Sequence, residues 1–199
     1  HLLDIGARVA HHARQLAGAH QPPLLDDGPL DRVAHAVPTT RLTEIDDIHM
    51  RSCTTCGSVI VPTSLILAAR LGADGALFAR SLRAGYETMM RFGVAVDGPA
   101  ILYRGLWPTY LAAPLGAAAA ASVLLQLTRA QSANALAIAL AQTSGAPGGP
   151  APGKSARWLL AGLAARAGVT AALAAREAEG VAALVGMKDQ LDQRGADLT

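Results

Sequence analysis

Residues 106–127 constrain the fold most, because this segment contains no charged residue and centres on an uninterrupted run of alanines. Its length would suffice to cross a lipid bilayer as a helix. However, Pro108, Pro114 and Gly116 interrupt it, and alanine is only weakly lipophilic. We therefore expect a helix buried in the core of a soluble helical bundle rather than a membrane span.

The size of the side chains favours the same architecture. Hydrophobic residues make up 51% of the chain but aromatic residues only 4%, so a core would be built from Ala, Leu and Val. Such small side chains let helices approach one another closely. No segment alternates polar and apolar residues as a half-buried strand does. The sequence predicts an all-α helical bundle that forms one domain over residues 1–199.

Apolar spacing and capping signals divide the chain into helices and loops. Thr128 and Gln131 form a capping-box pattern, Gly72 is typical of a helix end, and Pro62 suits a first turn. Glycines and prolines predict three loops: one that ends near Pro38, one that ends near Pro108, and one at 144–153. We expect helices at residues 2–16, 44–49, 59–71, 73–96, 109–127, 129–143, 156–178 and 181–194.

Charge and cysteine content exclude several classes of partner. The net charge is +2 and the basic residues are scattered singly, which gives no basic patch for nucleic acid. Two cysteines, Cys53 and Cys56, are too few for a disulfide framework, and the first residues show no signal-peptide pattern. We therefore expect a cytoplasmic protein with reduced thiols that binds neither nucleic acid nor membranes.

Two short patterns resemble known binding sites but lack the context that such sites need. Cys53 and Cys56 form one C-x-x-C with His49 nearby; without a second pair of ligands, we predict ordinary cysteines and no metal site. A later stretch fits the phosphate-binding pattern of P-loops, but its prolines remove backbone N–H donors and no strand precedes it, so we predict a plain loop. The residues that fit this pattern are Gly148, Gly153, Lys154 and Ser155.

Three carboxylates, an imidazole, several hydroxyls and both thiols gather in one polar segment, residues 43–58, of this otherwise apolar chain. Neighbouring carboxylates repel one another, which raises at least one pKa towards the range of a general acid or base. In the alternative interpretation, one carboxylate caps a helix and the others face solvent. The candidate residues are Glu44, Asp46, Asp47 and His49.

Four motifs follow one another along nearly the whole chain. They are E-I-D-D-I-H (44–49) followed by V-I-V-P (59–62), A-G-Y-E (84–87) with M-R (90–91), Y-R-G-L-W-P-T (103–109) with L-G-A-A-A-A (115–120), and L-L-A-G-L-A-A (159–165). Together they resemble the signatures of the MmgE/PrpD family, which includes 2-methylcitrate dehydratase and cis-aconitate decarboxylase. The resemblance implies the large all-helical domain of that family, which also forms a homodimer. It further implies metal-free, cofactor-free removal of water, loss of CO2 or epimerisation of small polycarboxylates.

Several positions depart from the family's motifs. The carboxylate of Glu44 stands where the resemblance places a catalytic aspartate, but other positions carry different chemistry. The chain also ends before the family's smaller α+β lid domain, so we expect that this domain is lacking or that a separate chain supplies it. The departures are Ile48 in place of a threonine, Thr54, Trp107 and Leu160 in place of histidines, and Arg157 in place of a lysine, with Lys154 one turn earlier.

Two functional hypotheses follow from the motifs and their departures. In the first, the protein is a diverged lyase or isomerase that takes a proton next to the carbonyl or carboxylate of a small molecule. In the second, it is a catalytically degenerate dimerisation or ligand-binding protein. For the first, Glu44, Asp46 or Asp47 would transfer the proton with His49 as partner. Arg104, Arg157 or Lys154 would hold the anionic oxygen, and Thr54, Tyr103 and Trp107 would line the pocket.

Overall fold

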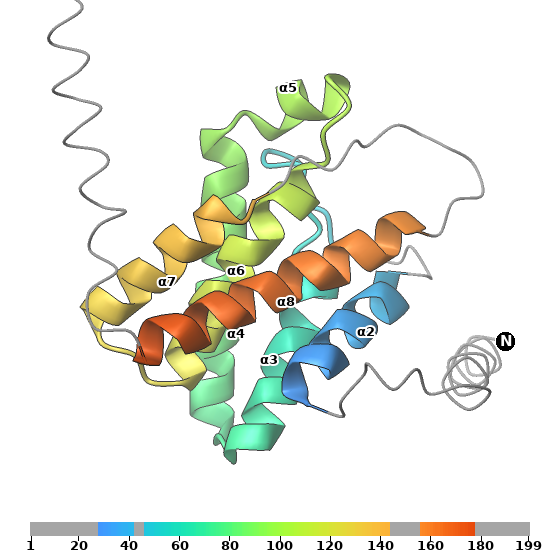
Figure 1. The fold of residues 1–199 in the computed structure, drawn as a ribbon. Helices are drawn as coiled ribbons and strands as arrows, with labels where there is room; N and C mark the ends of the chain where they lie inside the picture. The colour runs from blue at the N-terminus through green and yellow to red at the C-terminus, as the bar shows by residue number, and fades with distance from the viewer. Residues whose placement is uncertain (1–27, 42–45, 144–155, 178–199) are drawn as a thin grey trace, which may run out of the picture.

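A computed structural model describes residues 28–41, 46–143 and 156–177, and these residues form helices joined by short loops (Figure 1). No strand occurs in these three ranges, where a lone bridge between His49 and Thr54 is the nearest approach to one. The prediction of an all-α fold is therefore confirmed. The helices are α2 (Pro29–Arg41), α3 (Gly57–Leu71), α4 (Gly75–Ala95), α5 (Gly98–Tyr103), α6 (Pro108–Leu124), α7 (Arg129–Ala141) and α8 (Ala156–Glu177).

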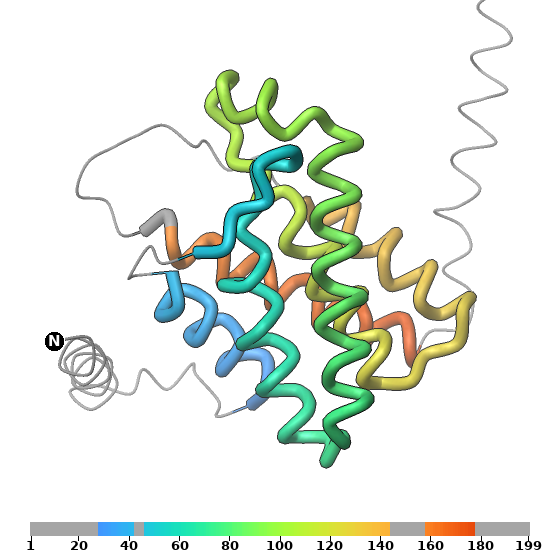
Figure 2. The backbone as a smooth tube through the Cα atoms, turned by 180° about the vertical axis from the view of Figure 1, so that it is seen from behind, coloured from blue at the N-terminus to red at the C-terminus, as the bar shows by residue number. Residues whose placement is uncertain are grey.

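Helix α6 forms the centre of the bundle. It packs against α3, α4, α7 and α8, while α2 lies across α3 and α8 on the outside (Figures 1 and 2). Nearly every residue of α6 is buried, including the alanine run at 117–121. The expectation that residues 106–127 supply a buried core helix is thus confirmed, although α6 ends earlier, at Leu124.

Glycines bring neighbouring helices into backbone contact. A Cβ atom on Gly168 of α8 would lie 2.1 Å from the carbonyl oxygen of Pro114 in α6. A Cβ on Gly162 of α8 would lie equally close, 2.1 Å, to the carbonyl oxygen of Ala34 in α2. Since real Cβ atoms do not approach oxygen this closely, only glycine fits these crossings. Small residues therefore set the tight spacing of the bundle, as the composition predicted.

Several predicted helix ends are confirmed. Thr128 and Gln131 form a complete capping box before α7, and Gly72 closes α3 in the left-handed conformation with φ 64°. Pro62 differs from the prediction, because α3 begins at Gly57 and places this proline in its second turn. Proline cannot donate to the carbonyl of Ser58, and the Thr40 hydroxyl donates to that oxygen instead, at 2.9 Å.

Three predicted elements are wrong, and one of them is the loop before Pro108, in which Gly98–Tyr103 form α5. The region before Pro38 was expected to be a loop but forms α2, because Pro29 begins the helix where no N–H donor is needed. The helix expected at 44–49 is absent over its described part, since residues 46–48 form no regular structure. Asp46 pairs with Arg41 and does not cap a helix. The helices expected at 2–16 and 181–194 and the loop at 144–153 lie outside the described residues.

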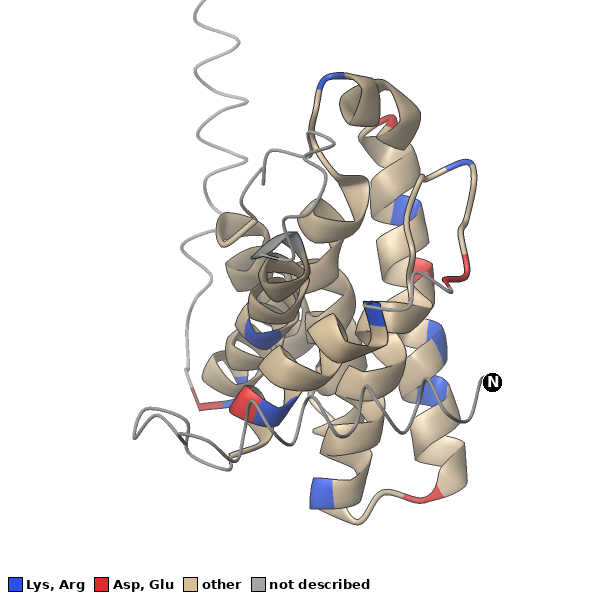
Figure 3. Cartoon of the chain, turned by 90° about the vertical axis from the view of Figure 1, so that its right-hand side faces the viewer, with Lys and Arg blue, Asp and Glu red and all other residues tan. Residues whose placement is uncertain are grey.

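Charged residues are scattered along the helices and loops in the view of Figure 3 rather than gathered in one segment. Within α8, the segment Trp158–Glu177 is long and apolar enough to cross a membrane. Half of its most apolar window is buried against the other helices, as in the core helix of a soluble protein. This finding is weak evidence for a membrane span.

Candidate functional site

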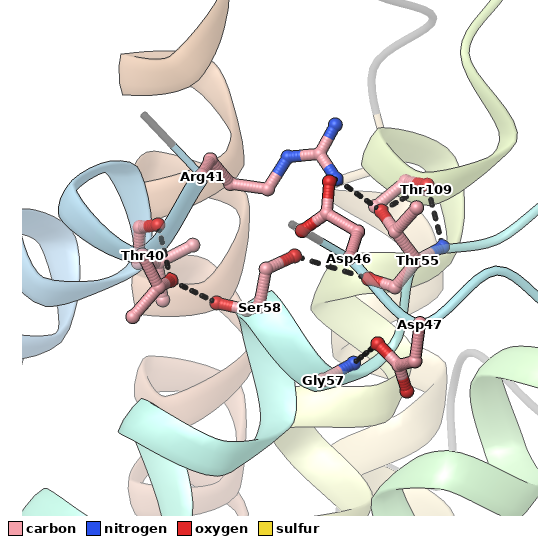
Figure 4. A network of polar contacts seen from close by, with 9 residues as sticks. Thr40, Arg41, Asp46, Asp47, Thr55, Gly57, Ser58 and Thr109 are labelled. Carbon is pink, nitrogen blue, oxygen red and sulfur yellow. Dashed lines mark hydrogen bonds and ion pairs between the residues drawn. The ribbon is translucent and has the colours of Figure 1, made fainter. Parts of the chain in front are cut away.

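Arg41 lies where four segments meet, and two of them, the starts of α6 and α8, are far from it in the sequence. It is the last residue of α2, and around it meet the loop at 46–56, the first turn of α6 and the first turn of α8 (Figure 4). Arg41 is only 3% exposed. Because a buried cation is costly unless it is paired, its contacts define how these segments are held together.

Polar contacts tie Arg41 to the loop at 46–56. Its Nη1 atom forms an ion pair with Asp46 and donates a hydrogen bond of 2.6 Å to the hydroxyl of Thr55. Thr55 in turn contacts α6, since its N–H donates to the Thr109 hydroxyl at 3.1 Å and the two hydroxyls are also 3.1 Å apart. The network in Figure 4 thus connects α2 to α6 through the loop.

Aromatic rings cover the remaining faces of the Arg41 guanidinium. Its carbon lies 4.9 Å from the ring centre of Trp158 and 5.9 Å from that of Trp107, both within the range of cation–π attraction. Trp107 also stacks on Tyr110 at 5.4 Å between ring centres. Among the described residues, the buried Nε atom of Arg41 has no hydrogen-bond partner. We call Arg41, Asp46, Thr55, Trp107, Thr109 and Trp158 the Arg41 junction.

Asp47 occupies a different position from Asp46. It is exposed, and its Oδ1 atom accepts a hydrogen bond of 2.8 Å from the backbone N–H of Gly57, the first residue of α3. A carboxylate at this end of a helix is stabilised by the helix dipole. The phenol of Tyr86 from α4 lies beside it, and burial together with hydrogen bonding to Asp47 raises the pKa of Tyr86.

His49 heads a chain of hydrogen bonds that runs into the interior of the loop. Its Nδ1 atom lies 2.7 Å from the Ser52 hydroxyl, which is 2.6 Å from the Thr54 hydroxyl. The Thr54 hydroxyl lies 3.4 Å from the sulfur of Cys56. Burial, the main cause, raises the pKa of Cys56 to about 11, so this thiol is protonated near neutral pH. These hydrogen bonds fix the loop and the orientation of the His49 imidazole.

The structure brings together some of the predicted site residues and separates others. Asp46, Asp47, His49 and Thr54 lie on the one loop at 46–56, and Trp107 packs against it through Arg41. Tyr103, the last residue of α5, is 92% exposed, and Arg104 directly after it is also exposed. Neither residue contributes to the Arg41 junction. Glu44, Lys154 and the side chain of Arg157 lie outside the described residues, although Arg157 directly precedes Trp158 in α8.

The described ranges contain no candidate metal site. Within them, no group of three or more His, Cys, Asp or Glu side chains is placed to hold an ion. Cys56 is buried and contacts Thr54, whereas the sulfur of Cys53 donates to the carbonyl of Met50 at 3.5 Å. The two thiols of the C-x-x-C pattern therefore have separate surroundings.

Sequence reasoning missed four residues of the Arg41 junction: Arg41, Thr55, Thr109 and Trp158. Two of them gave a signal, since Thr109 belongs to the L-W-P-T motif and Trp158 directly precedes L-L-A-G. Arg41 gave none, because an arginine at the end of an unrecognised helix resembles any surface arginine. Its burial depends on tryptophans from two distant helices.

Comparison with known proteins agrees with the motifs. A model of the MmgE/PrpD N-terminal domain matches residues 38–189, which include every residue of the Arg41 junction. No curated protein matches the chain.

Proposed function

The chain belongs to the MmgE/PrpD family, and from this premise we propose that it is a diverged lyase or isomerase. The reaction would remove a proton next to a carboxylate or carbonyl group of a small organic acid, without a metal or cofactor. The family includes dehydratases, whose chemistry requires this step. Such a step needs a base near the substrate carbon and a positive field for the enolate-like charge that forms.

The convergence of the family motifs in space carries the proposal. The acidic loop, the L-W-P-T segment and the start of α8 come from distant parts of the sequence, yet all of them contact Arg41. Burying a cation and a carboxylate among these segments costs free energy that apolar packing would avoid, which supports a purpose beyond packing. This arrangement is typical of a preorganised polar site.

Asp47 is the carboxylate best placed to accept a proton. Asp46 is buried, with 8% of its side chain exposed, and its ion pair with Arg41 would have to break before it met a substrate. Asp47 is exposed and already oriented by the N–H of Gly57. The positive end of the α3 dipole beside it would also favour the negative charge of an enolate-like intermediate.

The remaining roles follow the sequence hypothesis. Glu44 stays a candidate for the proton-transfer step, His49 for its partner, and Arg104, Arg157 or Lys154 for holding the substrate's anionic group. Arg41 acts differently, because its burial makes it a positioning residue for the loop. We further propose a homodimer in the cytoplasm.

Hydrogen exchange on candidate substrates tests the proposal. The protein would be incubated in D2O with a panel of small di- and tricarboxylic acids, and exchange of the C–H next to each carboxylate followed by NMR. We expect exchange with at least one acid, and its loss in Asp47→Asn. The matched control is Asp74→Asn, because Asp74 is exposed and caps α4 through Leu77 N–H, a role that asparagine also fills. Retention of full exchange in Asp47→Asn would contradict the role of Asp47.

A specific observation favours the second hypothesis, a catalytically degenerate dimerisation or ligand-binding protein. Trp107 stands where the resemblance places a histidine, and its ring packs against the Arg41 guanidinium. An indole cannot exchange protons as an imidazole does. If calorimetry detects binding of an organic acid that undergoes no exchange, the degenerate hypothesis replaces the catalytic one.

A further inference from the structure

Asp47 and Tyr86 approach the same point at the start of α3. A Cβ atom on Gly57 would lie 2.5 Å from Oδ1 of Asp47 and 2.8 Å from the hydroxyl oxygen of Tyr86. The two oxygens therefore flank one small space above the first residue of the helix. Any side chain at position 57 would fill that space, which explains why glycine begins α3.

The two residues come from different kinds of element. Tyr86 belongs to the middle of α4, and its ring packs against the main hydrophobic core of the bundle. Asp47 belongs to a stretch of irregular loop and is exposed. A phenol anchored in the core thus meets a carboxylate whose own backbone has no helix or strand to fix it. A side chain that is held by packing in this way can orient the carboxylate that it contacts.

We propose that Tyr86 is a positioning residue for Asp47. Tyr86 holds the Asp47 carboxylate at the start of α3 in the orientation that accepts the substrate proton. This inference rests on the proposed role of Asp47. Tyr86 itself exchanges no proton in the reaction. Its hydroxyl donates to one carboxylate oxygen, the Gly57 N–H donates to Oδ1, and the carboxylate remains free to receive the proton from carbon.

The protonation state of Tyr86 agrees with this role. Burial is the largest cause, and contact with the Asp47 carboxylate adds to it, so that the pKa of Tyr86 lies above the ordinary value for a tyrosine. The phenol therefore stays protonated at every pH at which the protein would work. A protonated phenol is a hydrogen-bond donor, which is what a positioning residue beside a carboxylate must be.

Two variants disrupt the contact between the Tyr86 hydroxyl and the Asp47 carboxylate by different means. Tyr86→Phe removes the hydroxyl and keeps the ring in the core, whereas Gly57→Ala keeps both groups and inserts a methyl between them. Because hydrogen bonds to charged groups are the stronger ones, we expect each variant to lower kcat for the exchange reaction about tenfold to a hundredfold, with KM nearly unchanged. The matched control is Gly75→Ala, since Gly75 likewise begins a helix and a Cβ there would meet nothing within 4 Å.

A second measurement needs no activity. Tyrosine labelled with carbon-13 at Cζ reports the ionisation of each phenol by NMR, and the signal lost in Tyr86→Phe identifies Tyr86. We expect Asp47→Asn to lower the pKa of Tyr86, because the substitution removes the negative charge that opposes ionisation.

The outcomes distinguish this inference from the proposed function. A Tyr86→Phe variant that unfolds like the wild type and keeps full kcat would overturn the positioning role while leaving the catalytic proposal intact. An unchanged Tyr86 titration in Asp47→Asn would overturn the contact itself. If the wild type exchanges no acid, the proposed function fails together with the catalytic purpose of Tyr86, whatever the titration shows.

Discussion

Replacing Arg41 with methionine removes the cation from the junction and keeps a side chain of comparable length. Asp46 would then lose the guanidinium with which it forms an ion pair, although only 8% of its side chain is exposed. The aromatic faces of Trp107 and Trp158 would lose their cation as well. The variant therefore tests whether charge, rather than shape, holds the four segments together.

The magnitude follows from burial. Breaking a buried ion pair by removing one partner costs about 3–5 kcal/mol, because the remaining charge stays in a poorly solvated place. The cation–π contacts add about 1 kcal/mol, part of which the methionine sulfur recovers against the rings. We expect the free energy of unfolding to fall by about 4 kcal/mol, which lowers Tm by about 10 °C in a chain of this size.

Urea unfolding followed by circular dichroism measures the effect, and the chain provides a matched control. Arg91 forms an ion pair with Glu87, but the two side chains are 82% and 45% exposed. Because exposed pairs contribute little, Arg91→Met should cost less than about 0.5 kcal/mol. The same substitution at two positions thus compares a buried with an exposed ion pair.

The double variant Arg41→Met/Asp46→Leu removes both charges of the pair. We expect it to regain most of the lost stability, since apolar pairs of similar size are often as stable as buried ion pairs. The reasoning would be refuted if Arg41→Met cost no more than Arg91→Met, or if the double variant were less stable than Arg41→Met alone.

Other consequences concern packing and thiol chemistry. Gly168→Ala should destabilise the protein by about 2–3 kcal/mol in urea unfolding, because its Cβ would lie 2.1 Å from the Pro114 oxygen, whereas Gly75→Ala should be neutral or slightly stabilising. Equal effects of the two would contradict tight packing of α8 on α6. Iodoacetamide should label Cys53 in the native protein but Cys56, which is 2% exposed, only after unfolding, as peptide mass spectrometry would show. The raised pKa of Cys56 predicts stability that is present below pH 9 and decreases as the pH rises to about 11, and Cys56→Ala should remove part of that decrease.

The bundle was predictable where the local sequence decides the structure. The alanine run predicted the buried helix α6, and the Thr128 capping box and Gly72 predicted helix ends that the structure confirms. Helix α2 was missed because the stretch up to Pro38 was interpreted as a loop. Pro29 lies in a first turn that needs no N–H donor, and the Ala34 carbonyl that Pro38 leaves unbonded within the helix faces the close crossing at Gly162. The tolerance of Pro38 within α2 therefore depends on α8, which lies more than a hundred residues later in the sequence.

The candidate site was predictable in its carboxylates but not in their partners. The polar composition of residues 43–58 singled out Asp46 and Asp47, and the structure keeps both on one loop. Spacing alone placed them on a helix, whereas Arg41 at the end of an unrecognised helix pairs with Asp46 and the first N–H of α3 pairs with Asp47. Such contacts depend on tertiary packing, which a local pattern does not encode.

One departure from the family motifs, the tryptophan at position 107, is physically coupled to Arg41. An indole at position 107 supplies a face for the guanidinium, Trp158 supplies a second, and Asp46 neutralises the charge. A histidine at 107 would replace the larger ring with a small titratable one beside a buried cation. Trp107→His alone should therefore loosen the junction rather than restore a family-type site, because protonated imidazole and guanidinium repel. A functional reversion would have to change the surroundings of Arg41 at the same time, so the tryptophan and the arginine act as one unit.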